Sequence, residues 1–102
     1  MLVFEDLWLD RRSRKAKRGD HWLYLSNTEF SLLELFMVHP DEVLSKHAIL
    51  REVWNEETYR DENIVEVYIN YLRRKVEAMG QSRIIRTVRG RGYVLERTPQ
   101  ES

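Results

Sequence analysis

The 102-residue sequence contains no cysteine. Without cysteine, the chain can form no disulfide, iron–sulfur cluster or thiolate zinc site. Its uninterrupted apolar runs extend over only a few residues, whereas a membrane-spanning helix needs about 20. Residues 1–6 lack the basic segment and long apolar core of a signal peptide. These absences predict a cytoplasmic protein, and an apolar content of 42% is typical of a folded globular domain.

The chain also has no net charge, since 17 basic residues balance 17 acidic ones. The charged residues are distributed unevenly along the chain. Residues 41–62 carry seven acids against three bases, whereas residues 73–97 carry eight bases against two acids. A further six bases and no acid lie within residues 11–18. Blocks of this kind can present a one-sided basic face to a polyanion, so the neutral total does not exclude nucleic-acid binding.

The N-terminal quarter of the chain has short apolar and aromatic stretches at residues 2–4, 7–9 and 21–25. Arg18-Gly19-Asp20 is a turn signal between the polar basic stretch and the third of these. We therefore predict a small antiparallel sheet within residues 2–25.

Helical periodicity begins after Ser26. Ser26 and Glu29 have the spacing of a capping box, in which each side chain accepts a hydrogen bond from the other residue's backbone amide. The apolar residues that follow predict a helix over residues 27–39, which Pro40 terminates. Ser45 is the expected N-cap of a second helix over residues 46–54. The polar, acidic residues 55–62 are predicted to form a loop.

A third helix is predicted over residues 63–79, followed by Gly80 as its C-terminal stop. Five apolar residues at spacings of 4, 3, 4 and 3 form a stripe that is expected to face the core: Val65, Ile69, Leu72, Val76 and Met79. The opposite face of the same helix carries Asn63, Val67, Asn70 and Arg74, flanked by Ile64 and Tyr71.

Two further strands, at residues 84–88 and 93–95, are joined by Arg89-Gly90-Arg91-Gly92. Its two glycines can adopt the positive φ of a tight hairpin. The chain is therefore expected to form one domain over residues 1–97, with a hairpin at 84–95 and a disordered tail at 98–102.

This order of elements predicts an α+β fold, a winged helix-turn-helix with an N-terminal antiparallel sheet, three helices and a C-terminal β-hairpin wing. In such a unit the third helix enters the major groove and the wing reaches the backbone or the minor groove. Aliphatic side chains can contact the thymine methyl group, asparagine can pair with adenine, and arginine with guanine or phosphate. The alternative, that some of these side chains pack against the loop or the wing, stays open.

Four stretches carry a resemblance to a known family: LSNTEFSLLELFMVHP, LSKHAILREVW, NIVEVYINYLRRKVE and IIRTVRGRGYVL. Together they resemble the effector domain of OmpR/PhoB-type response regulators of two-component systems. The resemblance implies a transcriptional regulator that binds direct-repeat half-sites on double-stranded DNA as a tandem dimer. It also implies that the 55–62 loop contacts RNA polymerase. The family's receiver domain is absent from this sequence, and we expect an excised effector domain rather than a regulator without a receiver.

The resemblance also assigns roles to residues. It places four residues in the major groove: Ile64, Val67, Asn70 and Tyr71. It places six at or near phosphates, Trp54, Asn63, Tyr68, Arg74, Thr87 and Tyr93, and it places Arg89 at the minor groove. Arg91, which lies beside Arg89 at the predicted wing tip, is a further candidate for DNA contact. Many family members have two arginines where this chain has Asn70-Tyr71, so base preference cannot be transferred. The basic run at 11–18 is expected to be a solvated edge of the sheet or a surface for the missing domain.

The sequence is also compatible with other functions. His21, His39 and His47 are scattered, with no metal-ligand spacing, so we expect no metal, no cofactor and no enzymatic activity. The main rival is a protein–protein interaction module that uses Ile64, Val67 and Tyr71 as an apolar patch, and RNA binding is a weaker one. The free domain is expected to be monomeric.

Overall fold

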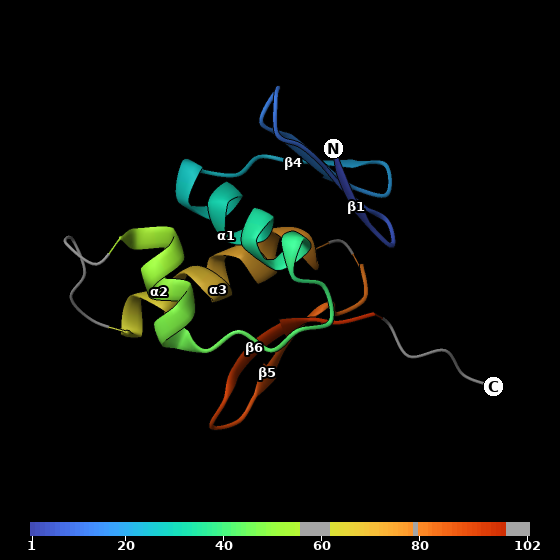
Figure 1. The fold of residues 1–102 in the computed structure, drawn as a ribbon. Helices are drawn as coiled ribbons and strands as arrows, with labels where there is room; N and C mark the ends of the chain where they lie inside the picture. Colours follow the sequence, from blue (N-terminus) through green and yellow to red (C-terminus); the bar gives the residue numbers. More distant parts are fainter. Residues whose placement is uncertain (56–61, 79, 98–102) are drawn as a thin grey trace.

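The computed structural model describes residues 1–55, 62–78 and 80–97. The elements follow the order β1–β4, α1–α3, β5–β6 (Figure 1). Their bounds are β1 Leu2–Phe4, β2 Leu7–Asp10, β3 Lys15–Arg18, β4 His21–Leu23, α1 Asn27–Val38, α2 Lys46–Trp54, α3 Asn63–Val76, β5 Ile85–Val88 and β6 Gly92–Leu95. The predicted winged helix, with a leading sheet and a terminal hairpin, is confirmed. The predicted tail at 98–102 and most of the 55–62 loop lie outside the described residues.

The first four strands form an antiparallel sheet in the order β1-β2-β3-β4. Successive side chains of a strand point to opposite faces. Here most inward side chains of β1 to β3 are buried, while the outward set includes an edge-to-face pair of Trp8 and Trp22. The prediction that residues 11–18 form a solvated edge is wrong for β3, which lies between β2 and β4. Ala16 and Arg18 point inward and are only 1% and 2% exposed.

Helix α1 starts at the predicted capping box. Glu29 N donates to Ser26 Oγ at 3.1 Å, and Ser26 N donates to Glu29 Oε1 at 2.8 Å. Together these bonds satisfy two donors that a helix start otherwise leaves without partners. The helix ends at Val38 and His39 is its C-cap, so it is one residue shorter than predicted.

Helix α2 begins at its predicted cap, where Ala48 N donates to Ser45 Oγ at 3.0 Å. Helix α3 begins at the predicted Asn63 but ends at Val76, three residues before the predicted end. Glu77 is the C-cap, and its backbone amide donates to Arg73 O at 2.8 Å. Met79, the last member of the predicted apolar stripe, lies outside the described residues.

The hairpin β5–β6 is attached to the helices by its second strand. Leu44 and Tyr93 exchange two backbone hydrogen bonds, of 2.8 and 2.9 Å, so the connection from α1 to α2 pairs with β6. Gly90 and Gly92 have φ values of +73° and +145°, as the hairpin prediction required. A Cβ at Gly92 would overlap the carbonyl oxygen of Leu44, so this close approach of two backbones requires glycine.

One core unites these parts. It includes Phe4, Leu7, Leu9, Phe30, Leu33, Phe36, Ile49, Val65, Ile69, Leu72, Ile85 and Leu95, all less than 4% exposed. No helix within the described ranges is long and apolar enough to cross a membrane.

Candidate nucleic-acid interface

Helix α3 has a buried face and an exposed face. Its four described stripe residues, Val65, Ile69, Leu72 and Val76, are fully buried. In Figure 1, α1 and α2 lie on the near side of α3 and cover this stripe. On the opposite face, Asn63, Asn70 and Arg74 are exposed, and Val67 and Tyr71 are each 43% exposed. The described part of the chain therefore leaves this face open along the whole helix.

A row of three aromatic rings borders the open face. Trp54, at the end of α2, meets Tyr68 edge to face, with 5.4 Å between the ring centroids. Tyr68 meets Tyr71 in the same manner at 5.3 Å. Trp54 and Tyr68 are half-buried against the core, so the row joins α2 to the exposed Tyr71. Ile64 also packs against the core and presents only part of its side chain to solvent.

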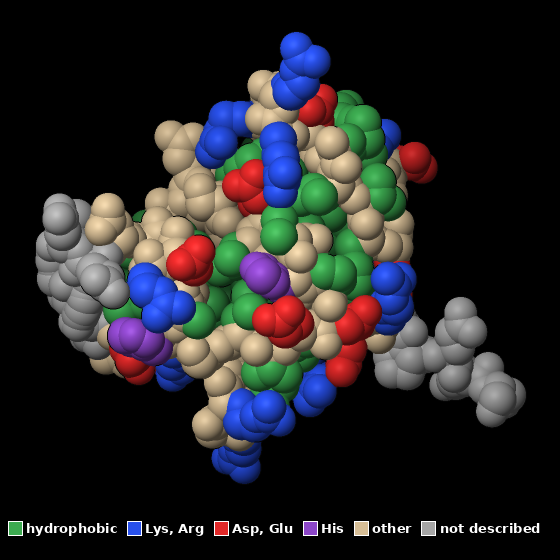
Figure 2. Space-filling model, viewed as in Figure 1, with side chains coloured by type: hydrophobic (Ala, Val, Ile, Leu, Met, Phe, Trp, Pro, Cys, Tyr) green, Lys and Arg blue, Asp and Glu red, His purple; other side chains and the backbone are tan. Residues whose placement is uncertain are grey.

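The wing tip carries cationic side chains. Arg89 and Arg91 are exposed at the turn between β5 and β6, and Lys and Arg side chains project from this end of the molecule (Figure 2). A backbone hydrogen bond from Arg91 N to Val88 O, 2.9 Å long, closes the turn. A guanidinium group on such a narrow projection can reach a phosphate or a narrow groove.

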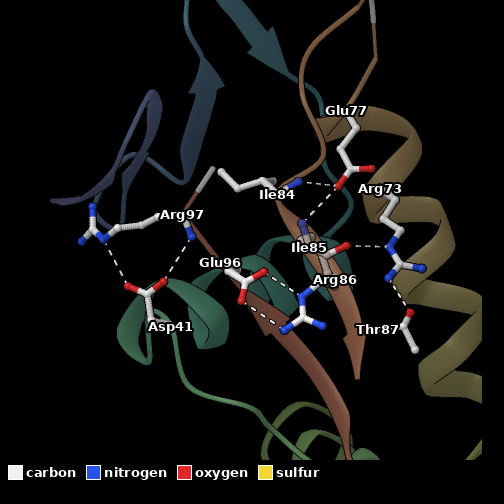
Figure 3. A network of polar contacts seen from close by, with 9 residues as sticks. All are labelled: Asp41, Arg73, Glu77, Ile84, Ile85, Arg86, Thr87, Glu96 and Arg97. Carbon is white, nitrogen blue, oxygen red and sulfur yellow. Dashed lines mark hydrogen bonds and ion pairs between the residues drawn. The ribbon is translucent and has the colours of Figure 1, made fainter. Parts of the chain in front are cut away.

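Arg73 holds the wing against α3. Its Nε donates to Ile85 O at 3.1 Å and its Nη2 donates to Thr87 Oγ1 at 2.7 Å, so both bonds end on β5 (Figure 3). The guanidinium carbon also lies 5.6 Å from the ring centre of Tyr93. The wing and the open face of α3 are thereby fixed relative to each other.

A groove of about 520 Å³ separates the wing from the first turns of α2 and α3. Its walls combine cations and anions, because Lys46 pairs with Glu66 at 3.8 Å and Glu62 lies close by. The cations that project freely from its rim are the arginines of the wing. A polyanion is therefore expected to meet the rim of this groove rather than its floor.

A partly buried ion pair joins α3 to α1. Lys75 Nζ donates to Glu29 Oε1 at 2.6 Å, and the Glu29 side chain is 6% exposed. Burial alone would raise the pKa of Glu29, but the hydrogen bonds from Lys75 and Ser26 prevail and hold that pKa below its ordinary value. Lys75 Nζ also donates to Tyr24 O at 2.8 Å.

The structure distributes the predicted site residues over three settings. Exposed on α3 or the wing are Asn63, Val67, Asn70, Tyr71, Arg74, Thr87, Arg89 and Arg91. Half-buried at the border of the open face are Trp54, Ile64 and Tyr68. Tyr93 is 4% exposed and its ring belongs to the core.

Two arginines that support the interface without forming part of it, Arg73 and Arg18, were not identified from the sequence. Arg73 lies on α3 between the buried stripe and the open face, a position whose neighbour depends on where the hairpin docks. Arg18 was counted as part of a solvated basic run, although the inward register of β3 buries it. The two-residue alternation with Ala16 was the signal available for Arg18.

Comparisons with known proteins agree with this geometry. Residues 20–95 match the family model described as "Transcriptional regulatory protein, C terminal". The response regulator MprA of Mycobacterium leprae is 51% identical over 98 residues, which is 96% of this chain and 43% of that protein. The chain thus spans less than half the length of this relative.

Solved structures show the same fold. The C-terminal domain of the nisin resistance regulator NsrR is 32% identical, with a TM-score of 0.80 over 97% of this chain and 100% of that one. The DNA-binding domain of RstA from Klebsiella pneumoniae, solved in complex with the RstA box, is 25% identical, with a TM-score of 0.77 over 93% and 95% of the two chains. The chain belongs to the family of C-terminal domains of transcriptional regulatory proteins, the non-enzymatic DNA-binding domains of OmpR/PhoB-type response regulators.

Proposed function

We propose that this chain binds double-stranded DNA sequence-specifically, with α3 in the major groove and the β5–β6 wing at the backbone and minor groove. The observation that carries the proposal is the division of α3 into a fully buried stripe and an open face of mixed chemistry. Apolar side chains such as Val67 and Tyr71, exposed on one face among polar ones, are typical of an interaction surface. A major groove offers both thymine methyl groups and hydrogen-bonding base edges, which suit this mixture.

Within this proposal, the residues fall into two roles. Val67, Asn70 and Tyr71, together with the exposed part of Ile64, contact base edges. The phosphate contacts come from Trp54, Asn63, Tyr68, Arg74, Thr87 and Tyr93, and Arg89 and Arg91 act from the wing. For Tyr93 the contact is restricted to the edge of a ring that otherwise belongs to the core.

The relatives suggest further partners. Since MprA is more than twice as long as this chain, we propose that the domain works as the effector part of a two-component regulator that also has a receiver domain. Residues 1–97 would form that effector domain in the cytoplasm and bind direct-repeat half-sites as a tandem dimer. The proposed contact of the 55–62 loop with RNA polymerase involves residues that are mostly outside the described ranges.

The rival reading is a protein–protein interaction module that uses the apolar part of the same face. Salt dependence separates the two. After selection of a binding duplex from random oligonucleotides, fluorescence anisotropy should show log affinity falling linearly with log salt, by about 0.9 per phosphate contacted. A flat salt response, or selection without enrichment of any sequence, would contradict the proposal and favour the protein interface.

A further inference from the structure

Arg18 is buried beneath the end of α3 with every side-chain nitrogen engaged. It is the last residue of β3 and only 2% exposed. Its Nε donates to Asp6 Oδ1 at 3.1 Å, and its Nη1 donates to Val76 O at 2.9 Å and to Ser82 O at 2.6 Å. Its Nη2 donates to Ser82 Oγ at 2.9 Å. The side chain thus connects the N-terminal sheet to the end of α3 and to the residues that follow it.

One of these acceptors, Val76 O, is at the negative end of α3. Val76 is the final residue of the helix, and its carbonyl has no partner within the helix. A cation here satisfies that carbonyl and also opposes the helix dipole. Because Arg18 extends from β3, it links the end of α3 to the N-terminal sheet.

Ser82, which accepts with both its carbonyl and its hydroxyl oxygen, belongs to the connection that leads from α3 into the wing. Farther along this connection, Glu77 Oε2 accepts from Ile84 N at 2.9 Å and from Ile85 N at 3.1 Å (Figure 3). Hydrogen bonds therefore hold this connection at Ser82 and again at Ile84 and Ile85. Ser82 lies three residues before the first residue of β5, so we expect a displacement of Ser82 to move the start of the wing.

We propose that Arg18 is a positioning residue for DNA binding, which fixes the angle between α3 and the wing from inside the fold without contacting DNA. The inference rests on the function proposed above, in which a duplex must meet both elements at once. At 2% exposure, the guanidinium group has no surface to offer a phosphate. Removing it would leave two carbonyls without their charged donor and would free the connection at Ser82. The conformational entropy of the wing would then decrease on binding, which would lower the affinity for DNA.

The test compares Arg18→Met and Arg18→Lys with Arg12→Met, which removes an exposed arginine from the same hairpin. Affinity for a selected duplex is measured by anisotropy at a temperature at which all variants are folded. The position of the wing relative to α3 is measured separately. Because the chain has no cysteine, Tyr71→Cys and Arg91→Cys add two specific sites for nitroxide labels. Double electron–electron resonance spectroscopy then gives the distance between α3 and the wing in the absence of DNA.

Arg18→Met is expected to lower affinity about tenfold and to broaden the distance distribution, since a hydrogen-bonded charge is lost. Arg18→Lys should restore part of both properties, and Arg12→Met should leave the distance distribution unchanged. If Arg18→Met lowers only the melting temperature, while affinity and distances of the folded protein match the parent, the proposal is overturned.

Two further outcomes are distinguished: an Arg18→Met variant that does not fold, and a parent domain that selects no duplex. If Arg18→Met does not fold, Ser82→Ala removes one acceptor, and parental affinity and distances in both Ser82→Ala and Arg18→Lys would overturn the proposal. If the parent domain itself selects no duplex, the proposed DNA-binding function fails instead. The distances between the labels would still decide whether Arg18 sets the position of the wing.

Discussion

Arg73 and Thr87 join the helix to the wing through a hydrogen bond of 2.7 Å between Nη2 and Oγ1. The same guanidinium group also donates to Ile85 O from a less exposed position. One arginine therefore spans the two elements that the proposed interface requires. The bond to Ile85 O is partly buried and the bond to Thr87 Oγ1 is exposed, so the two should contribute differently to stability.

Arg73→Met should lower the free energy of unfolding by about 1–2 kcal/mol, because Ile85 O loses a charged donor in a partly buried place. Thr87→Val should cost much less, since its hydroxyl is exposed to water. Urea denaturation of both variants measures this. Equal losses for the two variants would show that the Ile85 bond contributes little.

Replacement of Gly92 should damage the fold more than replacement of Gly90. A Cβ at Gly92 would overlap Leu44 O, whereas a Cβ at Gly90 meets no atom within 4 Å. We expect Gly92→Ala to destabilise the domain by about 2 kcal/mol or more and Gly90→Ala by about 1 kcal/mol, the cost of a positive φ. Thermal unfolding followed by circular dichroism compares them, and the reverse order would contradict the described contact of the hairpin with residue 44.

The stability contributed by Glu29 should depend on pH. Its pKa is lowered in the folded state, so the contribution is complete above the ordinary value of about 4.5 and is lost as the pH falls through the lowered pKa. Glu29→Gln should therefore cost about 1–3 kcal/mol at neutral pH and progressively less in acid. Denaturation curves from pH 7 to pH 3 measure this, with the exposed Glu52→Gln as control. A pH-independent difference between parent and Glu29→Gln would contradict the assigned cause.

The wing arginines should act through charge. Arg89→Ala combined with Arg91→Ala is expected to weaken DNA binding and to lower the salt slope by about one to two, with no fall in melting temperature. Arg11→Ala combined with Arg12→Ala removes the same charge from the N-terminal sheet and should leave the slope near that of the parent. An unchanged slope in the wing variant would remove the wing from the mechanism.

Asn70 should determine base preference. Its side chain is exposed on the open face of α3, so Asn70→Ala should relax the consensus obtained by random-site selection while the fold stays intact. Asn27→Ala, at the start of α1, serves as the control. Identical consensus sequences for the parent and Asn70→Ala would show that Asn70 reads no base.

Local signals predicted most of the fold. The Ser26–Glu29 spacing located the start of α1 because a capping box is complete within four residues. The open face of α3 followed from periodicity alone, since burial of one stripe exposes the opposite one.

The features that were missed depend on contacts between distant segments. Strand β3 has the sequence KAKR and little strand propensity, and it pairs because β2 and β4 lie on either side of it. The buried state of Arg18 depends on Val76 and Ser82, which are 58 and 64 residues away. Likewise, the early end of α3 coincides with Glu77 turning to cap the start of β5.

The face that meets DNA can be identified by titrating the ¹⁵N-labelled domain with its selected duplex and following the backbone amides by NMR. We expect the largest shifts and line broadening in α3 and at residues 87–92, and little change in β1 to β4. Perturbations confined to the N-terminal sheet, with the open face of α3 unaffected, would contradict this expectation.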